Sequence, residues 1–132
     1  MNNRLHNIRN PHQTKAKRVL CVCSAGLLRS PTLANVLHRE FGYNTRACGA
    51  ASHYALVVID EPLVAWADEI VFVDKDAYDE ARLYLGKDGY LNLKDYNCTI
   101  LGLPDKYPWM DEELQALALK QYNDSKVMAL AF

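Results

Sequence analysis

Three residues that can do chemistry, Cys23, Arg29 and Ser30, lie close together in the segment VLCVCSAGLLRSP, residues 19–31. Cys23 ends an apolar run, and five residues separate it from Arg29. An arginine guanidinium can bind two oxygens of a phosphate at once, and a cysteine thiolate is a strong nucleophile. The spacing therefore indicates an oxyanion site with a nucleophile at its floor.

The flanking residues predict how this site is positioned. Residues 18–23 read as a buried strand and residues 31–41 as a helix with apolar residues at helical spacing. In open α/β sheets, ligands bind beyond the carboxyl ends of the strands. We expect the backbone of this loop and of the first helical turn to bind the anion, and the helix N-terminus to favour the thiolate. The predicted phosphate-binding residues are Ser24, Ala25, Gly26, Leu27, Leu28, Arg29 and Ser30. Ser30 is expected to donate its hydroxyl to the sulfur of Cys23.

The rest of the chain alternates between strand and helix patterns. We predict strands at 45–50, 69–73 and 98–103, and helices at 61–67, 75–85 and 111–122. This alternation is typical of βαβ units. It predicts an α/β fold, a single-domain three-layer sandwich with a four-stranded parallel sheet, over residues 18–132.

Residues 1–17 form a polar, basic segment that we interpret as a flexible, solvated tail; docking on an acidic partner is the alternative. We see neither a signal peptide nor an apolar run long enough to cross a membrane, so a cytoplasmic protein is expected, with no membrane partner. Nucleic acid is not an expected partner either. The four cysteines contain no C-x-x-C pair, which argues against structural zinc and for free thiols.

The cysteine loop has the C-x5-R-[ST] spacing of cysteine-dependent phosphatases. Its place after the first strand, with Arg-Ser-Pro31 and the phrase Trp66-Ala-Asp-Glu-Ile-Val-Phe-Val73, resembles the low-molecular-weight protein tyrosine phosphatases over about residues 18–122. A bacterial and phage branch of that family fits best. The resemblance implies a flavodoxin-like, phosphotyrosine phosphatase I-like fold and phosphomonoester hydrolysis through a phosphocysteine, without metal or cofactor. It implies phosphotyrosine proteins or small aryl phosphates as substrates, and inorganic phosphate and other oxyanions as ligands.

The resemblance also implies a general acid, which the family takes from an aspartate in a loop near the C-terminal helix. Asp105, just after the predicted fourth strand, is our first candidate, because it lies at the same edge of the sheet as Cys23. Asp111 is the second candidate, although it is better explained as a cap of the last helix. Tyr107 and Trp109 are candidate walls of the substrate pocket; packing of Trp109 in the core is the alternative.

Two departures from the family pattern bear on activity. Ala25, Gly26 and Leu28 stand where the family usually has Gly, Asn and a second Cys, so a loop brace and a protective disulfide are missing. A phosphate- or phosphoprotein-binding module with weak or no catalysis is therefore the main alternative. A phosphocysteine carrier similar to sugar phosphotransferase IIB proteins would need neither Arg29 nor Asp105. An arsenate reductase would need a close pair of additional cysteines.

Overall fold

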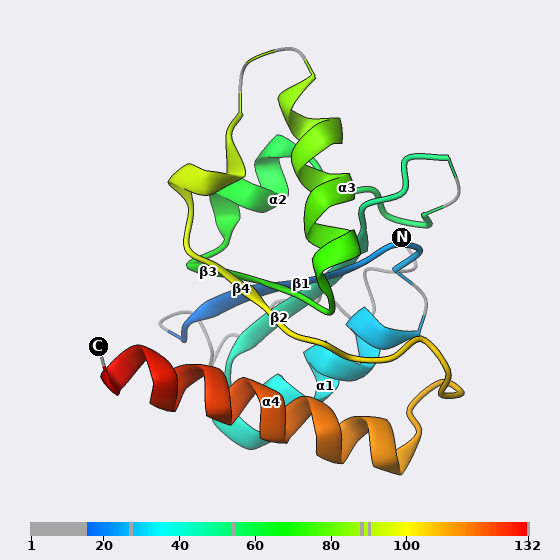
Figure 1. Ribbon diagram of the computed structural model, residues 1–132, viewed down its shortest axis with the longest axis vertical. Helices are drawn as coiled ribbons and strands as arrows, with labels where there is room; N and C mark the ends of the chain where they lie inside the picture. Colours follow the sequence, from blue (N-terminus) through cyan, green and yellow to red (C-terminus); the bar gives the residue numbers. More distant parts are fainter. Residues whose placement is uncertain (1–15, 27, 54, 88, 90, 132) are drawn as a thin grey trace.

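The computed structural model describes residues 16–26, 28–53, 55–87, 89 and 91–131. Its centre is one sheet of four parallel strands in the order β2-β1-β3-β4 (Figure 1). The strands are β1 (Arg18–Cys23), β2 (Asn44–Gly49), β3 (Glu69–Phe72) and β4 (Cys98–Ile100). Leu27 and most of the predicted tail, residues 1–15, lie outside the described residues.

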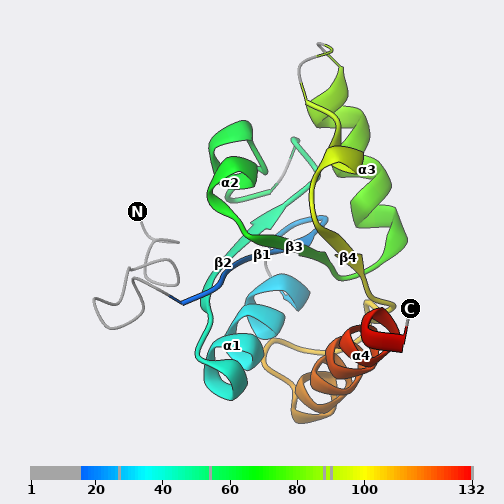
Figure 2. The same ribbon diagram turned by 90° about the vertical axis from the view of Figure 1, so that its left-hand side faces the viewer.

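Helices cover both faces of this sheet. Figure 2 shows α1 and α4 on one face and α2 and α3 on the other. The chain therefore has the three-layer α/β architecture that the sequence predicts. The helices are α1 (Arg29–Phe41), α2 (Glu61–Trp66), α3 (Lys75–Gly86) and α4 (Glu112–Ala131), with a 3₁₀ turn, η3 (Leu93–Asp95), before β4.

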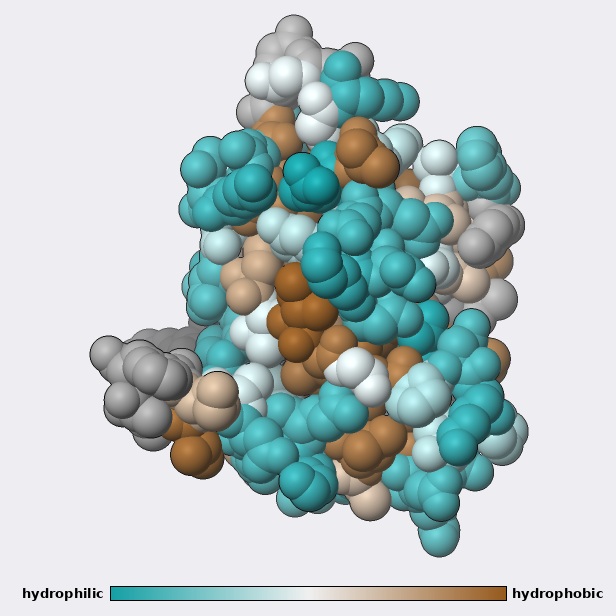
Figure 3. Space-filling view, in the orientation of Figure 1, coloured by the Kyte–Doolittle hydropathy of each residue, from teal (hydrophilic) through white to brown (hydrophobic). Residues whose placement is uncertain are grey.

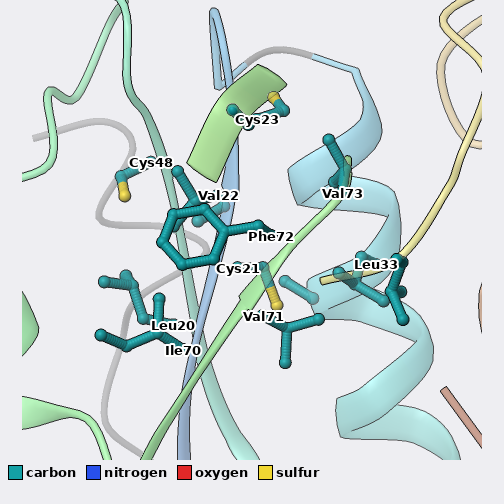
Figure 4. Close-up of a cluster of buried hydrophobic side chains, with 14 of the residues drawn as sticks. Leu20, Cys21, Val22, Cys23, Leu33, Cys48, Ile70, Val71, Phe72 and Val73 are labelled. Carbon is teal, nitrogen blue, oxygen red and sulfur yellow. The ribbon is translucent and has the colours of Figure 1, made fainter. Parts of the chain in front are cut away.

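Buried side chains on both faces of the sheet form the core. In Figure 4, Cys21 and Val71 lie on the side of α1 with Leu33, whereas Leu20 and Ile70 lie on the opposite side. Residues 19–22 of β1 have no exposed surface, as is typical of a central strand in a parallel sheet. The apolar run that precedes Cys23 thus fixes the nucleophile candidate at the end of a central, fully packed strand.

Local signals explain where several elements begin and end. Asp60 and Asp74 accept hydrogen bonds from backbone N–H groups at the starts of α2 and α3, which is ordinary N-capping. Gly42 ends α1 with a left-handed φ of 71°, a conformation that favours glycine. The first helix begins at Arg29, two residues before the predicted start.

Two further predicted boundaries were wrong. Helix α4 continues to Ala131 instead of ending at 122, because Lys120 pairs with Asp124 one turn later and Lys126 reaches the buried Glu69. Strand β4 ends at Ile100 instead of 103, although the chain still hydrogen-bonds to β3 as far as Leu103. The 3₁₀ turn η3 had no clear sequence signal.

The face of the molecule in Figure 3 is mostly polar, with a band of apolar atoms between α3 and α4. The edge strand β4 carries the exposed Ile100. No helix within the described part of the chain is long and apolar enough to cross a membrane.

Candidate active site

Cys23 is the last residue of β1 and is almost completely buried, with 3% of its surface exposed. Its sulfur accepts the backbone N–H of Gly26 at 3.0 Å, so the loop folds back on its own cysteine. Helix α1 starts only a few residues later, and no side chain caps its N-terminus at Leu28. The sulfur therefore lies where backbone N–H groups and the positive end of a helix favour an anion.

Ser30 lies against the same sulfur. The Cys23 thiol and the Ser30 hydroxyl oxygen are 3.1 Å apart, and Ser30 in turn donates to the carbonyl of Cys48 at 3.2 Å. In the thiol form Cys23 is the donor to Ser30. The single hydroxyl proton of Ser30 would have to turn from Cys48 to the sulfur once Cys23 is ionised. The structure thus brings the predicted pair together, with Ser30 serving as acceptor in this protonation state.

The loop after Cys23 packs closely on the end of β2. The carbonyls of Cys23 and Ser24 accept N–H groups of Ala50 and Ala51 at 2.8 and 2.9 Å. Gly26 has a φ of 75°, and a Cβ there would lie 3.0 Å from the backbone of Gly49. Backbone packing of this kind holds the loop, although the asparagine that the resemblance would lead us to expect is absent.

A second brace comes from α3. The hydroxyl of Ser24 donates to Oε1 of Glu80 at 2.6 Å, across 56 positions of sequence. Sequence reasoning missed Glu80, because the sequence around an acidic residue in a helix does not indicate which distant loop its side chain will contact.

Arg29 is held in one orientation by a partly buried carboxylate and a buried carbonyl. Its Nη1 lies 2.6 Å from Oδ2 of Asp74 and donates to the carbonyl of Leu103 at 2.9 Å. Arg29 as a whole is 7% exposed, and its Nε lies 3.7 Å from Oδ1 of Asp105. The structure therefore gathers Cys23, Arg29 and the Asp105 loop at one edge of the sheet, as the sequence predicts.

Asp74 was missed at the sequence level, although a signal for it existed. It lies two residues after the end of β3, the neighbour of β1 in the sheet. The order reverses between β1 and β3, which is where open α/β sheets bind ligands. Its Oδ1 caps α3 through the N–H of Ala77 at 2.8 Å while Oδ2 binds Arg29, so both oxygens are engaged.

The two aspartates considered as the acid lie in different settings. Asp105 projects from the loop after β4 with its side chain 69% exposed. Asp111 accepts the N–H groups of Glu113 and Leu114 at 2.8 and 3.2 Å, so it caps α4. The cap engages Oδ1 of Asp111, whereas Asp105 is exposed and lies within 3.7 Å of Arg29.

The two aromatic candidates also differ in setting. Tyr107 is half-buried and packs against the core, and a hydrogen bond with Glu113 raises the pKa of its hydroxyl. Trp109 is 55% exposed, so the alternative that it packs in the core is wrong.

The remaining cysteines are unsuited to serve Cys23. Cys48 pairs with Val22 across the sheet, so it faces the side opposite to Cys23, and Figure 4 shows the two side chains apart. Burial raises the pKa of Cys21 and Cys48 well above the usual value, and that of Cys98 to about 11. Among the described residues, no three histidine, cysteine or acidic side chains gather closely enough to hold a metal ion.

No protein-family model and no curated protein sequence matches this chain. Solved structures do. Wzb of Vibrio vulnificus, determined in complex with benzylphosphonate, aligns with a TM-score of 0.58 and 16% identity over 89% of this chain and 99% of its own. The low molecular weight phosphotyrosine phosphatase VcLMWPTP-2 of Vibrio cholerae O395 aligns with a TM-score of 0.54 and 16% identity over 88% of this chain and 97% of its own. This chain therefore has the fold of these two proteins along nearly its whole length.

Proposed function

We propose that this protein is a cysteine-dependent phosphomonoester hydrolase of the low-molecular-weight protein tyrosine phosphatase kind. The observation that carries the proposal is the position of the Cys23 sulfur. It lies at the carboxyl end of a central strand, accepts the Gly26 amide at 3.0 Å, and precedes a helix whose first residue is the immobilised Arg29. The fold shared with the two Vibrio proteins supports the same conclusion.

The reaction would proceed in two steps. The Cys23 thiolate attacks phosphorus, the P–O bond to the leaving group breaks, and Asp105 gives its proton to the departing oxygen. Water then loses a proton to Asp105 and attacks the phosphocysteine, which releases inorganic phosphate and the thiolate. Arg29 and the loop amides stabilise the charge on the three remaining oxygens in both steps. Ser30 would donate to the sulfur when it leaves as an anion.

The substrate class that fits best is an aryl phosphomonoester, including phosphotyrosine in a protein. One structural neighbour was determined with benzylphosphonate, an aromatic phosphonate. The half-buried Tyr107 and the exposed Trp109 follow Asp105 in the same loop and would wall an aromatic leaving group. A cytoplasmic location, with no metal, cofactor, membrane or nucleic acid required, belongs to the same proposal.

Hydrolysis of para-nitrophenyl phosphate in the presence of a chelator tests the assignment. Cys23→Ser should abolish turnover, and Asp105→Asn should lower it by a factor of about 100. Cys98→Ser and Asp111→Asn are the matched controls, since the first removes a different free thiol and the second keeps a capping side chain. Both controls should stay near the wild-type rate.

Three results would redirect the proposal. Binding of phosphate by a folded, reduced wild type without any turnover would favour the phosphoprotein-binding module. Equal losses in Asp105→Asn and Asp111→Asn would remove Asp105 from the acid role. Turnover that survives Cys23→Ser would overturn the cysteine mechanism altogether. A relay through a second thiol, as an arsenate reductase needs, is disfavoured because Cys48 faces the other side of the sheet.

A further inference from the structure

The loop that carries Asp105 is attached to α1 at both of its ends. At its start, the Leu103 carbonyl accepts Nη1 of Arg29 at 2.9 Å. At its far end, the N–H of Met110 donates to Oγ1 of Thr32 at 3.3 Å. Arg29 and Thr32 are three residues apart, so they share one face of the helix. The same helix surface that follows the cysteine loop thus holds the segment that carries the acid.

The far attachment holds a strained residue. Met110 has a φ of 56°, a left-handed conformation that is uncommon for a residue other than glycine. Such a conformation persists only where its surroundings fix it, and it is found most often at functional sites. Here two helices fix it, since Thr32 accepts its N–H and Nε2 of Gln115 donates to its carbonyl at 2.8 Å.

The hydroxyl of Thr32 both donates and accepts a hydrogen bond. Thr32 is fully buried, and its Oγ1 donates to the carbonyl of Leu28, four residues earlier, at 2.8 Å. This bond is a common one for a threonine within a helix and needs no functional explanation. The bond accepted from Met110 is different, because it connects the end of the cysteine loop to the Asp105 loop through one oxygen atom.

We propose that Thr32 is a positioning residue that holds the Asp105 loop beside Arg29, at the edge of the sheet where Cys23 ends β1. The inference rests on the proposed function, in which Asp105 is the proton donor. Proton transfer requires donor and leaving oxygen within hydrogen-bond reach. A loop released at Met110 would hold Asp105 less often at that distance, while the nucleophile and the oxyanion contacts remain in place.

Dependence on the leaving group separates this role from a structural one. A poor leaving group such as phenolate needs the proton from Asp105, whereas 2,4-dinitrophenolate departs without it. Thr32→Val should therefore lower kcat/KM for phenyl phosphate about tenfold and leave 2,4-dinitrophenyl phosphate within about twofold of wild type. Thr32→Ser keeps the hydroxyl and should restore activity with phenyl phosphate.

The matched control is Thr45→Val. Thr45 is also buried, and its Oγ1 donates to an α1 carbonyl, that of Ala34, at 3.0 Å. This variant removes a comparable hydrogen bond to the same helix without touching the Asp105 loop. It should leave the ratio of the two substrates unchanged.

A double-mutant cycle with Asp105→Asn gives a second test. If Thr32 acts through Asp105, then Thr32→Val should cause no further loss with phenyl phosphate in the Asp105→Asn background. Additive losses would overturn the proposal. Equal losses with both substrates in the single variant would also overturn it, because they would assign Thr32 to the cysteine loop through Leu28.

Amide hydrogen exchange tests the attachment independently of turnover. The Met110 amide should exchange at least about tenfold faster in Thr32→Val than in wild type or Thr45→Val. Unchanged protection of Met110 would overturn the inference even in an active enzyme. If the Met110 amide loses protection in Thr32→Val but the wild type shows no turnover, the attachment is supported and the proposed function is overturned.

Discussion

At the residue scale, Arg29 is oriented before any oxyanion arrives. Its Nη1 is shared between Asp74 and the Leu103 carbonyl, and Asp74 is itself fixed as the cap of α3. A guanidinium that is free in solution would lose rotamer freedom on binding, and these partners remove that cost in advance. The arrangement also explains how a nearly buried cation is tolerated, because its carboxylate partner compensates for the lost solvation.

Gly49 makes the tightest backbone approach beside the site. A Cβ at this position would lie 2.5 Å from the carbonyl oxygen of Ser24 and 2.7 Å from the backbone carbon of Ala25. We expect Gly49→Ala to lower the free energy of unfolding by about 1–3 kcal/mol through overpacking. It should also weaken phosphate binding, because the cysteine loop must move away from β2. Urea unfolding and inhibition by phosphate measure the two effects.

Gly86→Ala is the control for that prediction. A Cβ there meets nothing nearer than the Leu91 carbonyl at 3.6 Å, an ordinary contact. Its effect on phosphate binding should be negligible. Normal phosphate affinity in Gly49→Ala would contradict the view that the end of β2 sets the shape of the loop.

Cys23 could be singled out from the sequence, whereas its partners could not. It is the one cysteine that ends a predicted strand and is followed by a glycine-containing loop and an arginine, and these features are local. Asp74, Glu80 and Thr32 act through contacts that cross from 45 to 78 positions of sequence. Spacing along the chain carries no information about such pairs, so only the folded arrangement identifies them.

At the element scale, the buried carboxylate of Glu69 ties the amino-terminal edge of the sheet to α4. It accepts hydrogen bonds from Tyr122 and Lys126 of that helix and from Thr99 of β4, and Lys17 pairs with it at 2.8 Å. Burial alone would raise the pKa of Glu69. The four partners outweigh burial and lower it from the usual 4.5 to about 2.

The lowered pKa of Glu69 predicts how stability depends on pH. Glu69 contributes its full stabilisation above pH 4.5 and loses it as the pH falls towards 2, since protonation removes the ion pairs. The contribution is about 3 kcal/mol, and Glu69→Gln should remove a similar amount at neutral pH. Chemical denaturation of both proteins between pH 7 and pH 2.5 should give curves that converge at the acid end.

Asp124→Asn is the matched control, because Asp124 pairs with Lys120 on an exposed face of α4. Surface pairs of this kind contribute little to stability, so this variant should stay close to wild type across the pH range. If wild type and Glu69→Gln lose stability in parallel between pH 4.5 and 2.5, the ionised network is not what holds α4 to the sheet.

The element boundaries were predictable where local chemistry sets them. Asp60, Asp74 and Gly42 mark the ends of helices by their own capping and backbone preferences. The end of α4 depends instead on the distant Glu69, which draws Lys126 into the network. The polar residues 123–125, just past the predicted end of this helix, are therefore helical in the structure.

At the scale of the whole molecule, the site is assembled from the ends of three strands. Cys23 ends β1, Asp74 follows β3, and the Asp105 loop follows β4. The alternation of strands and helices predicts a parallel sheet, and a parallel sheet places all three strand ends at one edge. This part of the fold was predictable because the connection rules act on the whole chain. The order β2-β1-β3-β4, which places β1 beside β3, is a property of the fold that the structure supplies.

Because the site spans these strands, an oxyanion bound there should stabilise the entire domain. At a phosphate concentration 100 times the dissociation constant, linkage gives about 2.7 kcal/mol, or a rise in Tm of about 8 °C for a domain of this size. Cys23→Ser should retain the rise, since the loop amides and Arg29 remain. Arg29→Lys should reduce it to less than about 2 °C, because a point charge cannot replace the planar fork or reach Asp74 and Leu103 in the same way.

Arg39→Lys makes the same exchange at the far end of α1, where Arg39 is exposed, and should leave the phosphate effect intact. Chloride at equal ionic strength controls for ionic screening. Arg39→Lys in phosphate controls for the general stabilisation that an excluded anion such as phosphate gives without a site. Two results would mean that no specific oxyanion site exists at the cysteine loop. One is an equal rise in Tm with phosphate and chloride. The other is a phosphate-dependent rise in Tm that falls as much in Arg39→Lys as in Arg29→Lys. A phosphate-dependent rise in Tm that needs Arg29 and survives Cys23→Ser would instead separate binding from catalysis. The loop amides and Arg29 would then supply the affinity for the oxyanion on which the proposed chemistry of Cys23 and Asp105 depends.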